Sequence, residues 1–224
     1  MNDKLAIIFD MDGVLVDTYQ AHFESWRAVA AEEGLTVTED QFAPTFGRTS
    51  REIIAALWTE HRYDDDEIAR LDDRKEAAFR EIIRVRFPAM PGATELLRSL
   101  DEAGFALAVG SSGPPENIEL VLDGLGARAM FEAIVTGRDV TRGKPDPQVF
   151  LLASQRLGVS PERCAVIEDA PPGVAAANAA GMASIGLVST GRTRELLAAA
   201  DLVVDFLGEL SPAVLGRLIT GRRQ

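Results

Sequence analysis

The sequence predicts an α/β protein: a doubly wound parallel sheet with a small α-helical domain inserted into it. The first observation is a set of short, continuous apolar runs, each bounded by Gly, Pro or acidic residues, at residues 5–9, 105–109, 133–135, 164–167 and 183–188. Such runs suit parallel strands that are covered on both faces. The second is that helical patterns lie between the later runs, so strand and helix alternate from about residue 91 onward, as in a doubly wound sheet.

The helical patterns in this alternating part carry start and stop signals. Residues 94–103 have Pro91-Gly92 before them and Gly104 after them, and these residue types commonly mark helix boundaries. A second helix is expected to open at Pro114-Pro115, because proline is tolerated in a first turn. Two more are expected at residues 146–157 and 171–180, each followed by a glycine that suits a helix C-terminus.

Residues 19 to 87 break the alternation, because they contain no convincing strand and have helical periodicity throughout. Their apolar residues form three groups at helical spacing: Phe23, Trp26 and Ala30; Ile53, Ile54 and Leu57; Ile68, Leu71, Phe79, Ile82 and Ile83. The run Asp64-Asp65-Asp66 is interpreted as the acidic start of a helix rather than a metal site. We therefore predict a core domain of residues 1–17 and 89–224, and an inserted helical domain of residues 18–88.

Composition excludes several classes of protein. A formal net charge of −12 has the wrong sign for non-specific binding to nucleic acid, and no apolar run approaches the roughly 20 residues of a membrane span. Cys164 is the only cysteine, so an internal disulfide is impossible and an inert core thiol is expected. Because the N-terminus does not resemble a signal peptide, we expect a cytoplasmic protein. We also expect a monomer, with a dimer as the alternative. Gly191-Arg192-Thr193 and Arg222-Arg223 are interpreted as loop and tail charges.

Two carboxylates directly follow the first predicted strand, in the segment Asp10-Met11-Asp12-Gly13. Ligands of open α/β sheets bind at the carboxyl ends of the strands, where Asp10 would face the ligand with Asp12 beside it. Gly13 allows the backbone a sharp turn. Taken alone, the segment fits an ordinary acidic turn equally well.

Three other strand ends carry matching chemistry: Ser111, Lys144 in Gly143-Lys144-Pro145, and the pair Glu168-Asp169. Each has a structural alternative, namely a helix cap or a solvated loop cation. Together they supply a nucleophile, a proton donor, a fixed cation and carboxylates that suit Mg²⁺, which is what phosphoryl transfer needs.

These four motifs resemble those of the haloacid dehalogenase superfamily, specifically its β-phosphoglucomutase-like branch, from residue 9 to about residue 181. The resemblance implies a Rossmann-like core with a helical cap. It also implies roles: Asp10 as nucleophile, Asp12 as general acid and base, and Ser111 with Lys144 holding the phosphoryl group. Ser112 is the alternative to Ser111. Magnesium would bind Asp10, the backbone carbonyl of Asp12, and Asp169, with Glu168 as a further ligand or a neighbour that holds water.

Candidate substrate-binding residues lie in the inserted domain. The family branch often has a histidine at the position of His22, and the alternative is an ordinary surface or hinge histidine. The segment from Gly47 to Glu52 resembles the substrate-facing loop of the branch. Arg48 or Arg51 would bind a second phosphate or sugar hydroxyls there, unless the segment is simply the start of a helix. His61 is interpreted as a surface residue.

The resemblance implies an enzyme whose partner is a small phosphorylated substrate. We favour a magnesium-dependent phosphatase that acts on a metabolite such as a sugar phosphate. The alternative is a phosphomutase, which passes the same phosphoryl group to another hydroxyl and needs a cap that binds the far phosphate of the substrate. In the family branch a cap arginine, for which Arg48 or Arg51 would serve, and a cap lysine help with this. Lys75 is the only lysine in the inserted domain, and its position is uncertain from the sequence. A non-catalytic binding protein and a dehalogenase are disfavoured, because every residue expected for phosphoryl transfer is present.

Overall fold

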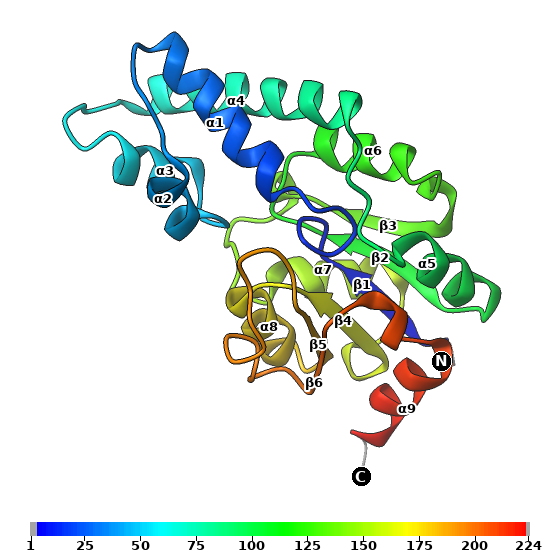
Figure 1. The fold of residues 1–224 in the computed structure, drawn as a ribbon. Helices are drawn as coiled ribbons and strands as arrows, with labels where there is room; N and C mark the ends of the chain where they lie inside the picture. Colours follow the sequence, from blue (N-terminus) through cyan, green and yellow to red (C-terminus); the bar gives the residue numbers. More distant parts are fainter. Residues whose placement is uncertain (1–3, 223–224) are drawn as a thin grey trace. The chain divides into compact units, whose positions relative to one another are not determined.

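Six parallel strands form the central sheet in the computed structural model, which describes residues 4–222 (Figure 1). Their order is β3-β2-β1-β4-β5-β6. The strands are β1 (Ala6–Phe9), β2 (Ala106–Gly110), β3 (Phe131–Val135), β4 (Cys164–Glu168), β5 (Ala183–Leu187) and β6 (Leu202–Val204). The predicted doubly wound α/β fold is confirmed, and five strands match the five apolar runs. The sixth, β6, was missed because three residues carry too little pattern.

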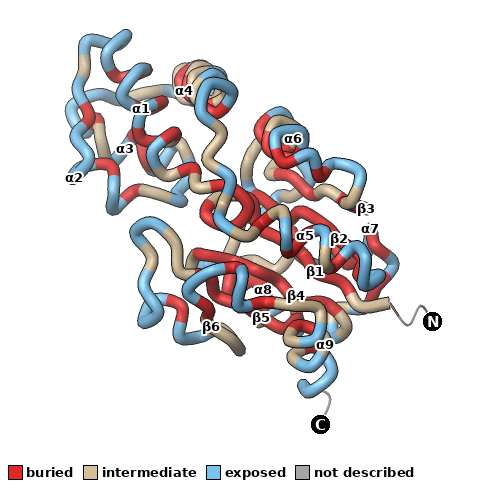
Figure 2. Tube along the Cα trace, turned by 45° about the vertical axis from the view of Figure 1, so that its right-hand side comes forward, coloured by how far each residue is buried: buried red, intermediate tan, exposed pale blue. Residues whose placement is uncertain are grey.

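Helices cover both faces of this sheet. They are α5 (Ala93–Glu102), α6 (Pro115–Gly124), α7 (Gln148–Leu157), α8 (Pro171–Ala179) and α9 (Pro212–Gly221). Helices α7 and α8 share one apolar cluster with alternate residues of β1 to β4, while α5 contacts β2 and α9 contacts β4 (Figure 1). The central strands are therefore buried along their whole length (Figure 2), which explains their continuous apolar runs.

The register of the three central strands brings their carboxyl ends together. Phe9 of β1 pairs with Val109 of β2 and with Ile167 of β4. The residues that follow Phe9, Val109 and Ile167 therefore lie level with one another at the same edge of the sheet. The backbone N–H of Asp10 continues the ladder by donating to the carbonyl of Ile167 at 3.0 Å.

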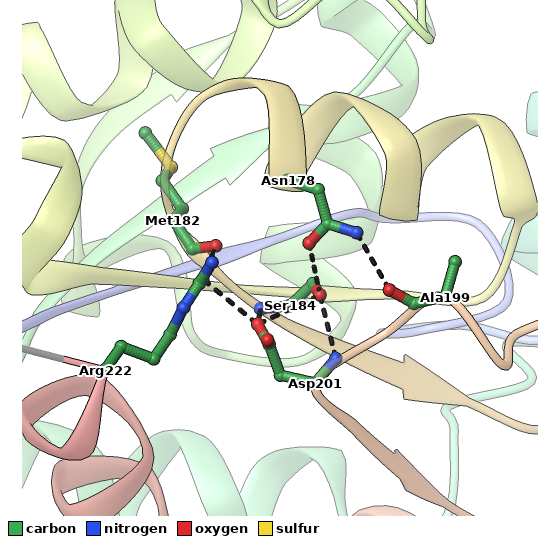
Figure 3. Close-up of polar contacts among 6 residues, drawn as sticks. All are labelled: Asn178, Met182, Ser184, Ala199, Asp201 and Arg222. Atoms are coloured by element: carbon green, nitrogen blue, oxygen red, sulfur yellow. Dashed lines mark hydrogen bonds and ion pairs between the residues drawn. The ribbon is translucent and has the colours of Figure 1, made fainter. Parts of the chain in front are cut away.

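A polar cluster joins β5 and β6 to the end of α9 (Figure 3). The Asp201 carboxylate accepts hydrogen bonds from the backbone N–H and the hydroxyl of Ser184, at 2.8 and 3.2 Å, and pairs with Arg222 at 3.0 Å. Arg222 also donates to the carbonyl of Met182. Its interpretation as a tail charge was therefore wrong, while Arg223 lies outside the described residues.

Residues 18–88 form a separate compact unit, and the core unit comprises residues 1–17 and 89–224. The helices of the smaller unit are α1 (Tyr19–Glu32), α2 (Glu39–Phe42), α3 (Ser50–Leu57) and α4 (Asp65–Val85). Aromatic and aliphatic side chains from these helices and the loops between them form its own core. Asp64 accepts from the N–H of Glu67 as the N-cap of α4, so the acidic run does begin a helix.

None of the helices within residues 4–222 has both the length and the hydrophobicity that a membrane span requires. Cys164 is fully buried, and burial raises the pKa of its thiol to about 12. That burial agrees with the predicted inert core thiol.

Candidate active site at the carboxyl edge of the sheet

The loop after β1 is tightly folded on its own backbone. The Met11 carbonyl accepts from the N–H groups of Leu15 and Val16, and the N–H of Gly13 donates to Val16 at 2.8 Å. Gly13 has a φ of 73°, a left-handed conformation that glycine adopts without strain. The turn places Asp10 directly at the end of the strand, as expected from the sequence.

Two glycines leave room for the acidic pair at the end of β4. A Cβ atom added at Gly13 would lie 2.1 Å from Oδ2 of Asp169, and one added at Gly173 would lie 1.8 Å from Oε1 of Glu168. Both distances are far below van der Waals contact. Gly13 and Gly173 are therefore needed because a larger residue would collide with the carboxylates that they face. This requirement is additional to any that the backbone conformation imposes.

Three carboxylates meet at this edge of the sheet. Asp10, Glu168 and Asp169 each offer one oxygen, and these oxygens lie within 4.8 Å of one another. All three residues are buried, with exposed fractions of 8%, 2% and 4%. Buried like charges at this spacing repel strongly unless a cation neutralises them.

Lys144 supplies one such cation. Its ammonium group donates to Oδ1 of Asp10 at 2.9 Å and to Oε1 of Glu168 at 2.8 Å, and it lies 4.9 Å from the centre of the Phe150 ring. Burial by itself lowers the pKa of Lys144, but Asp10 and Glu168 outweigh this effect and raise it. Lys144 therefore remains charged, and the alternative of a solvated loop cation is excluded.

The single positive charge of Lys144 does not balance the negative charges of three carboxylates. The raised pKa values of Asp10 and Asp169 reflect burial together with this surplus of negative charge. Burial raises the pKa of Asp10 to about 7; the charges of Glu168 and Asp12 add to the shift, while Lys144 opposes it. Burial, followed by the charges of Glu168 and Asp10, also raises the pKa of Asp169 well above its ordinary value. A cluster of hard oxygen ligands with surplus negative charge fits a divalent cation such as Mg²⁺.

Ser111 follows β2, the strand beside β1. It is 1% exposed, its N–H donates to the carbonyl of Val135 at 3.0 Å, and its hydroxyl accepts from the N–H of Gly113 at 3.1 Å. The structure thus places Ser111 buried at the same sheet edge as Asp10, while Ser112 beside it is exposed.

One residue at this edge was missed by sequence reasoning. Ser189, in the loop after β5, donates to Oδ2 of Asp169 at 2.7 Å. Burial raises the pKa of Asp169, and the charge of Arg192, three residues after Ser189, is the smallest of the effects that oppose this rise. No motif marks either residue, because their proximity to Asp169 arises only when β4 and β5 pair.

Within the helical unit, the structure brings together two residues that the sequence left apart. Nζ of Lys75 lies 2.8 Å from Nδ1 of His22 and 2.7 Å from Glu76. The His22 ring stacks on Phe79 at 4.3 Å between centroids, and the Lys75 side chain is 5% exposed. His22 is therefore half-buried and in contact with Lys75.

The segment around Arg48 begins helix α3. The Thr49 hydroxyl accepts from the N–H of Glu52, and the Glu52 carboxylate accepts from the N–H of Thr49 at 2.9 Å, which is a capping box. Arg48 and Arg51 are exposed, and Arg51 pairs with Asp65 at 2.7 Å. The segment therefore does begin a helix, and Arg48 lies exposed at this start. His61 is exposed, as predicted.

The comparisons with known proteins agree with the motifs. A model of haloacid dehalogenase-like hydrolases matches residues 5–181. The chain is 32% identical over 212 residues to validoxylamine A 7′-phosphate phosphatase of Streptomyces hygroscopicus, covering 91% of this chain and 94% of that one. It is 33% identical over 216 residues to β-phosphoglucomutase of Bacillus subtilis, covering 94% and 93%.

Among solved structures, β-phosphoglucomutase from Clostridium difficile superposes with a TM-score of 0.85 at 26% identity, covering 98% of this chain and 99% of that one. The family model, the relatives and the solved structure all indicate the same family. The chain is an enzyme of the haloacid dehalogenase-like hydrolase family and belongs to its β-phosphoglucomutase-like branch.

Proposed function

We propose that the protein is a magnesium-dependent phosphatase that hydrolyses a small phosphorylated metabolite, of the sugar phosphate class, through an aspartyl-phosphate on Asp10. The observation that carries the proposal is the buried Asp10 carboxylate, held by Lys144 at 2.9 Å beside Glu168 and Asp169. Lys144 fixes the orientation of the nucleophile and lowers its pKa, which favours the ionised form that can attack phosphorus.

The reaction would proceed in two halves. A carboxylate oxygen of Asp10 attacks phosphorus, the bond from phosphorus to the sugar oxygen breaks, and Asp12 gives that oxygen a proton. Asp12 then takes a proton from water, whose oxygen attacks the same phosphorus. The bond between phosphorus and Asp10 breaks, releasing inorganic phosphate and restoring the carboxylate. Asp12 would thus act as acid and then as base.

Magnesium would be held by Asp10, Asp169 and the backbone carbonyl of Asp12, with Glu168 as a further ligand or neighbour. When bound, it reduces the repulsion between an anionic nucleophile and an anionic phosphate. Ser111 and Lys144 would hold the phosphoryl oxygens, which suits positioning and electrostatic stabilisation as the main sources of catalysis.

We also propose that residues 18–88 act as a cap that supplies substrate contacts and excludes water. Its candidate contacts are His22, Arg48 and Arg51, with Ser112 as a candidate on the core unit. The exposed guanidinium of Arg48 would suit a second phosphate or sugar hydroxyls.

A phosphomutase is the second candidate function, and Lys75 is the observation that favours it. Lys75 would be the cap lysine that a mutase needs, since it lies beside His22. However, its ammonium group already contacts His22 and Glu76 and is buried. We therefore favour the phosphatase, in which water accepts the phosphoryl group.

The deciding assay follows phosphate release and isomer conversion together, on a panel of sugar phosphates with Mg²⁺. Release without conversion is expected, while rapid interconversion of β-glucose 1-phosphate and glucose 6-phosphate without release would show a mutase. Asp10→Asn and EDTA should each abolish turnover, and added Mg²⁺ should reverse only the EDTA effect. Asp205→Asn, which changes an exposed ion pair with Arg194, is the control and should keep full activity.

A further inference from the structure

The loop after β5 contributes a side chain to the carboxylate cluster. The Ser189 hydroxyl donates to Oδ2 of Asp169 at 2.7 Å, although Asp169 lies in the loop after β4 and Ser189 in the loop after β5. A Cβ atom added at Gly13 would lie 3.2 Å from this hydroxyl and 2.1 Å from Oδ2 of Asp169. The loops after β1, β4 and β5 thus meet around one carboxylate oxygen.

The loop that carries Ser189 is anchored on both sides of that residue. The N–H of Val188 donates to the carbonyl of Val204 at 2.9 Å, and the N–H of Arg192 donates to the carbonyl of Ser189 at 3.0 Å. Ser189 is therefore held in place by its surroundings and does not depend on Asp169 for its position.

We propose that Ser189 is a positioning residue, whose hydroxyl holds the Asp169 carboxylate in the orientation that binds the divalent cation. A carboxylate rotates over a broad range about its last torsion. One hydrogen bond to Oδ2 limits that rotation, so that Asp169 presents its oxygen to the same space as Asp10 and Glu168. Such outer contacts of a ligand typically change metal affinity by about 10- to 100-fold.

The proposal rests on the proposed function only in that a divalent cation binds this cluster. The test therefore measures metal binding directly. Mn²⁺, used in place of Mg²⁺, is titrated into the metal-free protein without substrate, and free Mn²⁺ is counted by electron paramagnetic resonance. Ser189→Ala should raise the dissociation constant by about tenfold or more, with the melting temperature of the metal-free protein nearly unchanged.

Two variants separate positioning from a merely structural effect. Ser189→Thr keeps the hydroxyl and should restore the wild-type dissociation constant. Thr190→Ala removes the neighbouring hydroxyl, which contacts Asp17 and not the cluster, and should leave Mn²⁺ binding unchanged. In turnover, Ser189→Ala should need more Mg²⁺ for half-maximal activity, yet reach the wild-type kcat once Mg²⁺ saturates.

Equal Mn²⁺ affinity in Ser189→Ala and the wild type would overturn the proposal, and so would a Ser189→Thr variant as weak as alanine. A wild type that binds no Mn²⁺ would overturn it as well. Failure of the proposed function has a different signature: no phosphate release from any substrate, while Mn²⁺ still binds and Ser189→Ala still weakens it.

Discussion

At the residue scale, the candidate site is a cluster of charges that the folded chain holds together against their repulsion. Three buried carboxylates lie together, only two of them are paired with the Lys144 ammonium group, and burial raises the pKa of Asp10 to about 7. The metal-free site is therefore strained electrostatically at neutral pH. A divalent cation bound as proposed would relieve this strain, so metal binding and stability should be linked.

The raised pKa of Asp10 predicts how the stability of the metal-free protein depends on pH. Between pH 3.8 and about 7, the folded protein keeps a proton on Asp10 that the unfolded chain has lost. The free energy of unfolding should therefore fall as pH rises through this range. Asp10→Asn cannot ionise, so near pH 8 it should exceed the wild type in stability by roughly 1–4 kcal/mol, and near pH 4 the difference should shrink.

Urea unfolding in EDTA across this pH range measures the difference, and the wild type and Asp10→Asn serve as each other's reference for all other titrating groups. The prediction fails if the two proteins keep a constant difference in stability at every pH.

Gly173 offers a second test at the residue scale. Alanine there would place a Cβ atom 1.8 Å from Oε1 of Glu168, so Glu168 must move and lose its 2.8 Å contact with Lys144. We expect Gly173→Ala to weaken metal binding and reduce turnover by about tenfold or more. Steady-state kinetics against Mg²⁺ concentration measures both effects.

Gly216 is the matched control, because it also lies in a helix and a Cβ added there would lie 3.9 Å from Cδ1 of Leu5, an ordinary van der Waals contact. Gly216→Ala should leave turnover unchanged and stabilise the protein by about 0.5–1 kcal/mol. Comparable activity loss in both variants would point to a general effect of alanine in these helices rather than to a collision with Glu168.

At the element scale, the edge of the sheet opposite β3 depends on polar contacts as well as apolar packing. Strand β6 has three residues, which offer few ladder hydrogen bonds. The Asp201 carboxylate, just before this strand, binds β5 through Ser184 and α9 through Arg222 (Figure 3). One side chain thus joins two strands and the final helix.

Asp201→Ala should therefore destabilise the protein. It leaves the buried Ser184, which is 1% exposed, without the acceptor of its backbone N–H, at a cost of about 1–3 kcal/mol. Thermal unfolding measures the loss. Asp205→Ala, which removes only an exposed pair with Arg194, should cost less than about 1 kcal/mol. An equally small cost for Asp201→Ala would show that the cluster contributes little.

At the scale of the whole molecule, each of the two units has a hydrophobic cluster of its own among residues 4–222. In the core unit one such cluster lies between the sheet and helices α7 and α8, and in the helical unit another is formed within residues 18–88. Both tryptophans of the chain, Trp26 and Trp58, belong to the second core. Tryptophan fluorescence therefore reports on the helical unit, while metal binding to the carboxylate cluster reports on the core unit.

This separation predicts that damage to one core spares the site on the other unit. Leu71→Ala, at a residue 4% exposed in the helical core, should lower the stability detected by tryptophan fluorescence by about 2–5 kcal/mol. Mn²⁺ affinity of the folded protein should stay within about twofold of the wild type, because no ligand moves. Leu97→Ala, fully buried in the core unit, is the reciprocal variant.

Urea unfolding followed by fluorescence, together with Mn²⁺ titration, reads the two units separately. A tenfold loss of metal affinity in Leu71→Ala would contradict the independence of the two cores.

Much of the fold and of the site followed from local patterns. Continuous apolar runs identified five strands because both faces of a central parallel strand are buried. Asp10, Ser111 and Glu168-Asp169 could be grouped because the carboxyl ends of such strands share one edge. β6 was missed because three half-buried residues do not produce a recognisable run.

Sequence alone thus determined the class of fold, the family, the residues at the ends of β1, β2 and β4, and Lys144 in the loop between β3 and α7, since each is encoded in a few neighbouring positions. Tertiary structure alone decided which side chains touch. Ser189 contacts Asp169 and Lys75 contacts His22, and in each pair the two residues lie far apart in the chain. The raised pKa of Asp10 likewise comes from burial and from the charge of the distant Glu168. Such contacts depend on strand register, helix packing and burial, and these are set only when the whole chain has folded.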